Sequence, residues 1–526
     1  MDNTKRKKAS GVAEYAKTIL LVVLFVSVIV LSGMYIVTLN RSGIVSRDNV
    51  SRDDITFEKL WTVQDDAGSE NVLSGIVMPQ FMGFKTAEQR SPVGVSVGEK
   101  YLKELYKKAG LYLYYAFGNG ADIRKIPDAE SEMFWLSLIH SDDYIYIRYH
   151  QAIPHQLIQA SGGDSAGMGY SEYNRTEGSI VYVKDLFILP LSGVEGASDE
   201  SESHSYEIAV RDSDDSVYIF TPQKKLSDGE ESGAAAYPYP GIDFALNEVV
   251  RILITAYGEG MQGYHFAYSN GDDRAVYADK LTTVTEMGIP LRKISAEKNG
   301  GRLIYSNAGN FEQIVRIFNF NPDKINTYSE AKNTNIYVET HGSLKIAEDR
   351  LTYTARNGVG IPMSDFIGYS HSGSDGDIYD MVRAAQKFIE SVRNINANYV
   401  GKDADMYISG VYKKDDKIVI EYSYYLDNVK IELDEKEYAL SIESDGYNIT
   451  HVDLFTLSVD AAAADTTLSY TQKWAIKRHL SDRISEGGEN EQIRVNDVRL
   501  VYSAISGEDY ILPNWRISLN AESAEN

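Results

Sequence analysis

The segment TILLVVLFVSVIVLSGMYIVTL, from Thr18 to Leu39, contains no charged residue and no proline. A helix rises about 1.5 Å per residue, so this segment would extend for about 33 Å, enough to cross the hydrocarbon core of a bilayer. Inside lipid every backbone polar group needs an internal partner, and a helix supplies one. The sequence therefore predicts a single transmembrane helix at residues 18–39.

Two other interpretations of this segment are a cleaved signal peptide and a helix buried in a soluble core. The apolar part of a signal peptide usually has about 7–15 residues and ends at a cleavage site of small residues. Here the residues Met34, Tyr35, Ile36 and Val37 continue the apolar run. The chain has no cysteine that could carry a lipid. An uncleaved anchor is therefore the favoured interpretation.

The charges beside this segment predict its orientation. Residues 1–17 carry a net charge of +3, from Lys5, Arg6, Lys7, Lys8 and Lys17 against Asp2 and Glu14. The whole chain carries −24 at pH 7, so the remaining sequence is strongly acidic. Basic flanks stay on the cytoplasmic side of a membrane. We expect a cytoplasmic stub at residues 1–17, a single-pass helix in the cell membrane, and the bulk of the chain outside the cell.

The composition limits the possible functions. A chain of 526 residues with 43% hydrophobic content is long enough to bury several cores. The absence of cysteine excludes disulfides, thiolate zinc sites and cysteine nucleophiles, and a disulfide-free external protein fits a bacterial surface. The strong negative charge argues against nucleic acid as a partner. The 38 tyrosines predict a sheet-rich external part.

The predicted fold class is α+β, with the transmembrane helix followed by a multi-domain ectodomain of antiparallel sheets that carry helices packed on one face. The expected organisation after the anchor is a linker at residues 40–56, an N-terminal ectodomain region at 57–300, a middle α+β domain at 301–400 and a C-terminal α+β domain at 401–520. The sequence has no tandem repeat of solenoid period, but the last two regions share one pattern, antiparallel strands with a helix across one face.

Periodic patterns place the elements. The strongest soluble helix is predicted at 377–394, where Ile378, Met381, Val382 and Ala385 recur at helical spacing. Alternation of residue types predicts a strand at 143–150. The apolar run at 243–256 is compatible with either a helix or a strand. Further elements are expected as helices at 97–108, 311–318 and 470–484, and as strands at 206–210, 217–220, 336–338, 344–346, 351–355, 406–412, 418–424, 429–433, 439–442, 448–456, 495–503 and 509–518.

Two short motifs match catalytic or nucleotide-binding patterns but lack the required surroundings. Residues 163–167 match G-x-S-x-G, yet glycine and serine surround them where that motif needs a strand and a helix. Residues 258–263 match G-x-G-x-x-G, but the following residues 264–268 have the pattern of a strand, whereas a dinucleotide site needs a helix there. We therefore interpret the first motif as a loop and the second as a hairpin turn.

Metal and catalytic sites are not predicted either. The acidic groups at 212–215 and 375–377 do not complete a calcium-binding loop. The histidines His140, His150, His155 and His265 show no ligand spacing. A glycosidase needs only two catalytic carboxylates, and a long acidic chain contains many pairs that could serve, but nothing in the sequence singles out one pair. We therefore predict no catalytic, cofactor-binding or metal residue.

Small residues inside the predicted anchor are the candidate interaction residues. Ser27 and Leu31 share a helix face with Met34, while Ser32 and Gly33 leave room for a neighbouring helix. The segment contains no complete G-x-x-x-G motif. The segment is compatible with two interpretations, a helix that pairs with a neighbouring helix and a helix surrounded only by lipid.

Several segments together resemble one family. These are AKTILLVVLFVSVIVLS in the anchor, FEQIVRIFNFNPDKI, NTNIYVETHGSLKI and LTYTA in the middle, and VNDVRLVYS followed by YILPNWRI near the end. In this order they resemble the YycH family, membrane-anchored regulators of the WalK/WalR two-component system of Gram-positive bacteria. The last segment also resembles the companion YycI family and PepSY-like modules. The chain differs by acidic insertions near 195–205 and 226–241.

The resemblance implies a function without catalysis. It implies that the protein contacts a WalK-like sensor histidine kinase and a YycI-like partner in and outside the membrane, and that it restrains the kinase that controls cell-wall homeostasis. Such regulation works by biasing a two-state kinase. One alternative function is an extracytoplasmic enzyme that acts on peptidoglycan or another glycan, and such an enzyme requires carboxylates or histidines clustered in a cleft. The other alternative is a ligand-binding surface protein, which requires one well-formed pocket.

Overall fold

The structure is a computed structural model, and the chain divides into two compact units, Met1–Glu70 and Asn71–Asn526. The described residues all belong to the second unit. They are residues 76–86, 89, 91–96, 101–109, 121–126, 143–155, 157–158, 182–190, 206–211, 217–222, 246–258, 261–266, 275–277, 281–283, 290–297, 304, 307–330, 334–356, 358–367, 378–433, 438–467, 471–486, 492–503 and 511–522. Among these residues no helix is long and apolar enough to span a membrane, and the anchor expected at 18–39 lies outside them.

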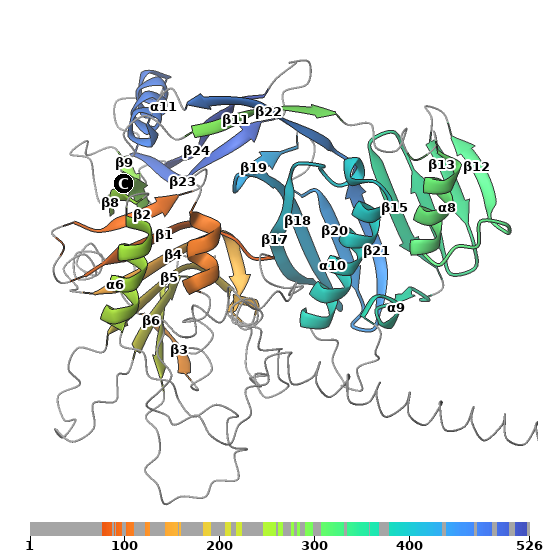
Figure 1. Ribbon diagram of the computed structural model, residues 1–526, viewed down its shortest axis with the longest axis horizontal. Helices are drawn as coiled ribbons and strands as arrows, with labels where there is room; N and C mark the ends of the chain where they lie inside the picture. The colour runs from red at the N-terminus through yellow and green to blue at the C-terminus, as the bar shows by residue number, and fades with distance from the viewer. Residues whose placement is uncertain are drawn as a thin grey trace, which may run out of the picture. The chain divides into compact units, whose positions relative to one another are not determined.

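The fold is mixed α+β with mostly antiparallel sheets, which confirms the predicted class at that level. The described strands form sheets of nine, two and thirteen strands. The described strand pairs are antiparallel, except that β23 (Gln492–Ser503) pairs in parallel with β19 (Val429–Glu432) and with β9 (Ala275–Tyr277). Figure 1 shows the elements along the chain.

The nine-stranded sheet is built from the first half of the second unit. Its strand order is β10-β8-β2-β1-β4-β5-β6-β7-β3. In chain order the strands are β1 (Pro79–Lys85), β2 (Val93–Ser96), β3 (Ala121–Ile126), β4 (Tyr144–Pro154), β5 (Tyr182–Pro190), β6 (Tyr206–Arg211), β7 (Val217–Pro222), β8 (Gln262–Phe266) and β10 (Leu281–Thr283). Helix α6 (Leu246–Tyr257) contacts β1 and β4. The ambiguous apolar run at 243–256 is therefore a helix.

Aromatic side chains fill the core of this sheet. The ring of Phe81 lies 4.9 Å from that of Tyr264, and the rings of Tyr146 and Phe187 stack at 4.4 Å. Tyr264 crosses over Gly83, where an added Cβ would lie 2.4 Å from the Tyr264 hydroxyl. Glycine at position 83 therefore provides the space that this tyrosine occupies.

A charged pair is enclosed in the same sheet. Arg148 on β4 lies directly opposite Asp185 on β5, and Nε of Arg148 is 3.0 Å from Oδ1 of Asp185. The hydroxyl of Tyr146 also donates to Oδ1 of Asp185, at 2.6 Å. The two charged side chains are only 4% and 1% exposed. Burial of two charges requires such direct pairing, because an isolated buried charge is very costly.

Eight strands of the largest sheet form an internally repeated arrangement. A first set follows helix α8 (Ala308–Ile317), and a second set follows helix α10 (Ile378–Ile395). The first set is β12 (Asn326–Glu330), β13 (Thr334–Val338), β14 (Gly342–Ile346) and β15 (Arg350–Ala355). The second set is β17 (Asp405–Lys414), β18 (Lys417–Leu426), β20 (Leu440–Ser444) and β21 (Asn448–Phe455).

The last strands of the two sets join them. β15 pairs with β21 in antiparallel fashion, so the strand order is β12-β13-β14-β15-β21-β20-β18-β17. The first strands of the two sets lie at the two outer edges of this arrangement. The order indicates an approximate two-fold relation about the β15–β21 pair. The two sets, at 308–355 and 378–455, do not coincide with the regions 301–400 and 401–520 for which a shared pattern was expected.

The helices cover one face of these eight strands, as Figure 1 shows. Directly paired residues lie on the same face of a sheet, so the register identifies that face. One row across it is Thr327, Tyr337, Leu344, Tyr353, Val452, Ile442, Ile420 and Val411. Phe318, after α8, lies 5.5 Å from the ring of Tyr353 and 5.5 Å from that of Phe388 on α10. This row and the two helices therefore form one core.

The remaining strands connect to this arrangement. β19 follows β18 after a tight turn and pairs with β23, whose other partners include β24 (Pro513–Glu522). β11 (Pro290–Glu297) and β22 (Ser458–Thr467) form the two-stranded sheet. Smaller elements are β16 (Ile361–Pro362), α9 (Ser364–Ile367), the 3-10 helix η4 (Ala397–Tyr399) and α11 (Gln472–Glu486).

The strand pairing runs across the domain boundary that was expected near residue 400. α10 lies before that position, β17 to β21 lie after it, and β15 of the preceding region pairs with β21. The division into regions 57–300, 301–400 and 401–520 stays a prediction. The strand pairs place the described strands from β12 to β21 in one sheet.

Candidate protein-binding surface

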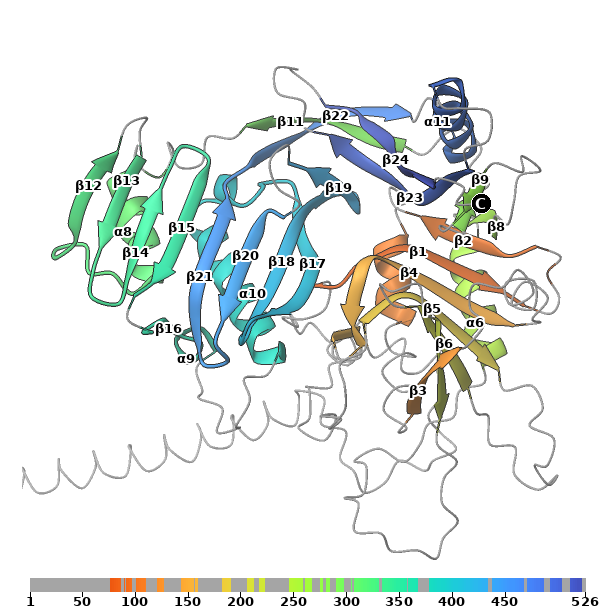
Figure 2. The ribbon, with the colours of Figure 1, turned by 180° about the vertical axis from the view of Figure 1, so that it is seen from behind.

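The face of the eight strands opposite to α8 and α10 is the candidate functional surface. We call it the open face, since α8 and α10 lie on the other side of the strands, as Figure 2 shows from behind. At its β17–β18 end it is partly covered, because Lys103 lies over the ring of Tyr407 and His150 contacts Tyr425. Two rows of directly paired residues define it. They are Tyr328, Ile336, Lys345, Thr352, Asp453, Ser441, Glu421 and Gly410, and Asn326, Val338, Ser343, Thr354, His451, Glu443, Val419 and Tyr412.

The centre of the open face is an arginine–aspartate cluster on the β15–β21 pair. Nε of Arg350 donates to Oδ1 of Asp453 at 2.5 Å, and Nη2 donates to the second carboxylate oxygen. Tyr438 donates to Asp453 at 2.9 Å and Thr352 at 3.2 Å. The Asp453 side chain is 2% exposed, whereas that of Arg350 is 35% exposed. The cluster therefore buries the carboxylate and presents the guanidinium.

The surroundings fix the charges of this cluster. Burial alone would raise the pKa of Asp453, but the hydrogen bonds from Arg350, Tyr438 and Thr352 hold that pKa below its ordinary value. The hydrogen bond to Asp453 in turn raises the pKa of Arg350. Burial, followed by the Asp453 charge, raises the pKa of Tyr438. The carboxylate is therefore ionised and the phenol neutral at physiological pH.

Aromatic rings hold the guanidinium in place. The Arg350 guanidinium carbon lies 4.8 Å from the centre of the Phe455 ring, which is a cation–π contact. The Tyr438 ring lies edge-on to Phe455 at 6.2 Å. Arginine and tyrosine held rigidly in this way lose little freedom on binding, and these two residue types dominate the energetics of protein interfaces.

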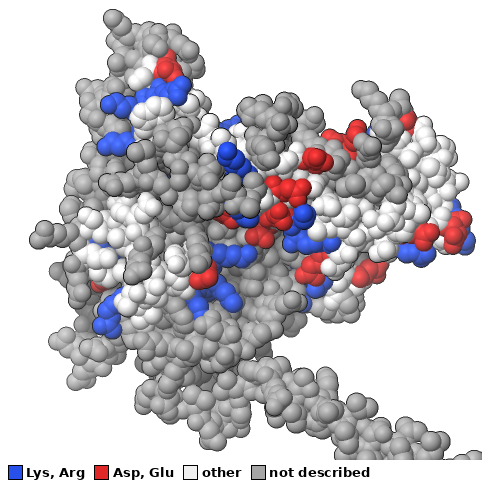
Figure 3. Space-filling model, turned by 45° about the horizontal axis from the view of Figure 1, so that its top comes forward, with Lys and Arg blue, Asp and Glu red and all other residues white. Residues whose placement is uncertain are grey.

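The charged side chains of the open face balance. Lys345 binds Glu330 at 2.9 Å, and Glu443 lies 3.7 Å from Lys414 and 3.3 Å from Lys417. With the central pair, Glu421 and Asp405, which is bound by Lys103, the face carries basic and acidic side chains next to one another. Such local neutrality in a chain of net charge −24 lowers the repulsion that an acidic partner would meet. Basic and acidic residues also lie close together on the surface drawn in Figure 3.

Tyrosines lie toward both ends of the open face. Tyr328 is 60% exposed and Tyr412 is 41% exposed. The Tyr412 hydroxyl donates to Glu421 at 2.9 Å, and burial together with this hydrogen bond raises the pKa of Tyr412 to about 12. Exposed tyrosine rings supply contact area at low entropic cost. The face thus combines a central arginine with outer aromatic residues.

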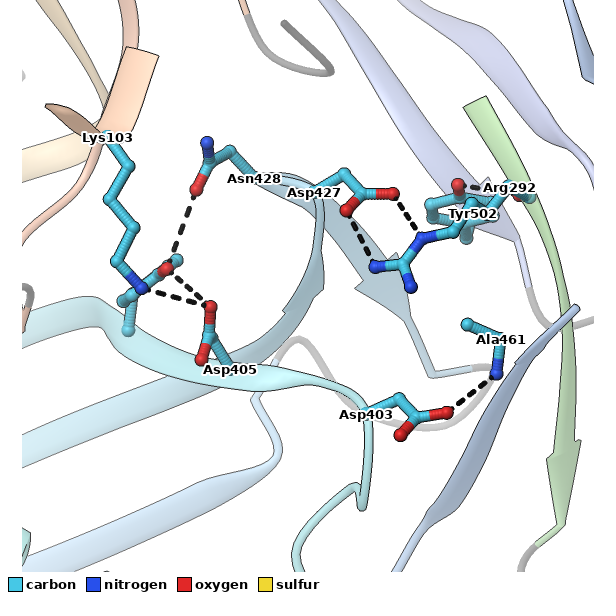
Figure 4. A network of polar contacts seen from close by, with 9 residues as sticks. Lys103, Arg292, Asp403, Asp405, Asp427, Asn428, Ala461 and Tyr502 are labelled. Carbon is cyan, nitrogen blue, oxygen red and sulfur yellow. Dashed lines mark hydrogen bonds and ion pairs between the residues drawn. The ribbon is translucent and has the colours of Figure 1, made fainter. Parts of the chain in front are cut away.

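A second polar network lies beside the β18–β19 turn (Figure 4). Asp427, at the turn, receives two hydrogen bonds of 2.7 Å from Arg292 on β11. Asp405 is bound by Lys103 at 3.4 Å and by the Tyr407 hydroxyl at 2.8 Å. Figure 4 shows these contacts coming from different strands and from the helix at 102–109. Each carboxylate already has partners, so we interpret this network as a structural connection.

The residues that the sequence analysis considered lie in different places. The candidate interaction residues Ser27, Leu31, Ser32, Gly33 and Met34 lie outside the described residues, as do both acidic groups and the motif at 163–167. The second glycine motif lies between α6 and β8, so the strand expected after it is confirmed, whereas the expected hairpin turn is wrong because a helix precedes the motif. Within the described part of the chain, no three His, Asp or Glu residues are grouped to hold a metal ion.

His150 is the described histidine with the strongest perturbation. It lies in β4, its ring centre is 4.9 Å from that of Tyr425, and its Nε2 is enclosed. Burial, followed by the positive charges of Lys430, Arg499 and Lys184, lowers the pKa of His150 to about 3. The imidazole is therefore neutral at physiological pH.

Comparison with known proteins gives little further information. No family model matches the chain, and no curated protein matches it. One similar solved structure is an uncharacterized protein from Eubacterium rectale ATCC 33656. It is 15% identical, with a TM-score of 0.31, and the match covers 49% of this chain and 85% of that chain. A likeness at this level carries no argument about fold or function.

Sequence reasoning did not identify the open face. Arg350 and Asp453 are about a hundred residues apart in the chain and meet only through the β15–β21 pairing. The available signal was local. Polar and apolar residues alternate in RLTYTA and in THVDLF, which indicates strands with one solvent-exposed face. The partner strand of each could not be deduced from this alternation.

Proposed function

We propose that the protein is a membrane-anchored extracytoplasmic regulatory protein that binds a sensor histidine kinase and restrains it. The observation that carries the proposal is the Arg350–Asp453–Tyr438 cluster, a preorganised guanidinium at the centre of a charge-balanced face. This is the chemistry of a protein-binding hot spot. The predicted anchor at 18–39 and the resemblance to the YycH family support the membrane location and the class of partner.

The mechanism that we propose is a shift of population. A partner that binds one state of a two-state kinase more tightly moves the equilibrium toward that state by its difference in affinity. The open face would supply the contact outside the membrane, and Ser27, Leu31, Ser32, Gly33 and Met34 are the residues of the anchor that would pack against a neighbouring helix. A YycI-like protein would share the assembly.

The test is a pull-down of the tagged full-length chain from membranes, with the sensor kinase identified by mass spectrometry. One variant carries Arg350→Ala and Tyr412→Ala, and a second has residues 18–39 replaced by an unrelated spanning helix. Loss of the kinase with the first variant assigns recognition to the open face, and loss with the second assigns it to the anchor.

The matched control for the open-face variant carries Lys387→Ala and Tyr447→Ala. Lys387 lies on α10, and Tyr447 is 55% exposed in the turn between β20 and β21. The control should retain the kinase. Recovery of no sensor kinase with the native chain would contradict the proposal, and binding to wall glycans would then be the next measurement.

A further inference from the structure

The free edge of β12 is a second feature that the proposed function does not use. Among the described strands, β12 ends the order of the largest sheet, and all five of its residues are exposed. Its pairing with β13 is regular, and the strand contains neither proline nor a bulge. An unprotected regular edge presents backbone groups to which another strand can pair.

The hydrogen-bond alternation identifies the residues that face this edge. Glu339 N–H donates to Gly342 O at 3.0 Å, which closes the β13–β14 hairpin. Bonded pairs alternate along an antiparallel ladder, so Ile336 and Val338 point their backbone groups toward β12. Their partners in β12 point back, and the intervening Thr327 and Ser329 direct N–H and C=O outward.

We propose that β12 pairs with β12 of a second copy of this chain, in antiparallel orientation with Thr327 opposite Thr327 of the second copy. In this register the outward-facing groups of Thr327 meet each other and those of Ser329 meet residue 325, as a bonded antiparallel ladder requires. The two eight-stranded arrangements would then continue into each other about a two-fold axis, the commonest symmetry of protein dimers.

The charges around the edge support a second copy as the occupant. Thr327 pairing brings Glu330 of the second copy to the turn before β12, in which Lys324 lies, and the two-fold axis makes this contact twice. Lys324 is exposed, and Glu330 is half exposed, with one carboxylate oxygen on Lys345 at 2.9 Å. Opposite charges across paired strands stabilise a sheet, whereas like charges destabilise it. The edge is therefore complementary to itself.

The absence of cysteine from the chain allows a direct test by cross-linking. Thr327→Cys introduces the only thiol, on the proposed two-fold axis. Bonded antiparallel pairs have Cα atoms about 5.5 Å apart, within the range of a disulfide. Mild oxidation of cells that express the full-length variant should yield a covalent dimer, seen on a non-reducing gel. Tyr447→Cys, also at an exposed position but away from the edge, is the matched control and should stay monomeric.

A charge exchange in the Thr327→Cys background tests the register. Lys324→Glu alone and Glu330→Lys alone each place like charges opposite each other and should lower the cross-linked fraction about tenfold. The double exchange should restore it. Lys324 lies in the turn before β12 and Glu330 at the far end of that strand, so this restoration requires two chains. Thermal unfolding of each variant reports whether the fold is kept.

The proposal fails if Thr327→Cys yields no more dimer than Tyr447→Cys, or if the double exchange stays as low as the single exchanges. Neither result depends on a kinase, so the outcome is separate from that of the proposed function.

Discussion

Two arginine–aspartate pairs that connect neighbouring antiparallel strands differ in how far the arginine is exposed. Arg148 and Asp185 lie opposite each other on β4 and β5 and are enclosed on all sides. Arg350 and Asp453 join β15 and β21, with the carboxylate buried and the guanidinium 35% exposed. The first pair can act only within the protein, whereas the second can also contact a partner. Exposure of one partner is therefore what separates a structural pair from a candidate binding residue.

The largest expected effect comes from breaking the enclosed pair. Asp185→Asn leaves the Arg148 charge without its carboxylate in a buried position, and we expect a loss of about 3–5 kcal/mol in the free energy of unfolding. Chemical denaturation of the full chain measures it. The matched double variant Arg148→Met, Asp185→Leu removes both charges and should recover much of the loss. A single variant as stable as the native chain would contradict this account.

Breaking the Arg350–Asp453 pair on the open face should lower the free energy of unfolding less than breaking the enclosed pair does. Asp453→Asn removes the acceptor of Arg350, Tyr438 and Thr352, and we expect a loss of about 1–3 kcal/mol at pH 7. The pKa of Asp453 is below its ordinary value, so its stabilisation is complete above about pH 4 and is lost as the pH falls further. Denaturation below pH 4 should therefore show a weaker pH dependence for the variant than for the native chain.

An enclosed histidine, His150, gives the nine-stranded sheet a pH dependence of its own. His150 has a pKa of about 3 in the folded chain, against an ordinary value of about 6.5, so only the unfolded chain binds a proton between these values. Stability should therefore fall as the pH decreases through this window, by about 1.4 kcal/mol at pH 5.5. His150→Gln should abolish this contribution. An unchanged slope between pH 6.5 and 5 would show that His150 is accessible to protons.

The smallest effect on stability is expected at the exposed tyrosine of the open face. Tyr412→Ala removes a ring that is 41% exposed and its bond to Glu421, so the free energy of unfolding should change by less than about 1 kcal/mol. Its effect should appear instead in partner binding. Tyr447→Ala is the control of the same residue type. Equal binding by both variants would remove Tyr412 from the candidate surface.

Local patterns predicted most of the described elements. The alternation at 143–150 corresponds to β4, the amphipathic run at 377–394 to α10, and the paired segments near 210 and 218 to β6 and β7. These signals depend only on which face of an element is buried, and that information is present in a short window.

One strand contradicts local propensity. β22 contains four consecutive alanines, residues 461–464, which favour a helix, and the sequence analysis placed no element there. In the structure β22 pairs with β11 from Pro290↔Thr467 to Glu297↔Ser458. The long-range pairing therefore determines the conformation, and no local pattern reveals it.

The arginine–aspartate cluster at the centre of the open face could not be predicted from the sequence for a related reason. Arg350, Tyr438 and Asp453 each have an ordinary strand or turn environment in the sequence, and their meeting depends on the pairing of two strands from different repeats. A pattern of polar residues on one strand face indicates only that this face is not in the core. It does not indicate which charged groups meet there.

The most direct test of the proposed function is the pull-down with a matched pair of double replacements. One full-length variant carries Arg148→Met and Asp185→Leu, and the other carries Arg350→Met and Asp453→Leu, so each loses one arginine–aspartate pair. The account predicts that the first variant still recovers the sensor kinase and that the second loses it while both stay folded. Recovery of the kinase by the folded open-face variant, at the level of the native chain, would contradict the claim that this face binds the partner.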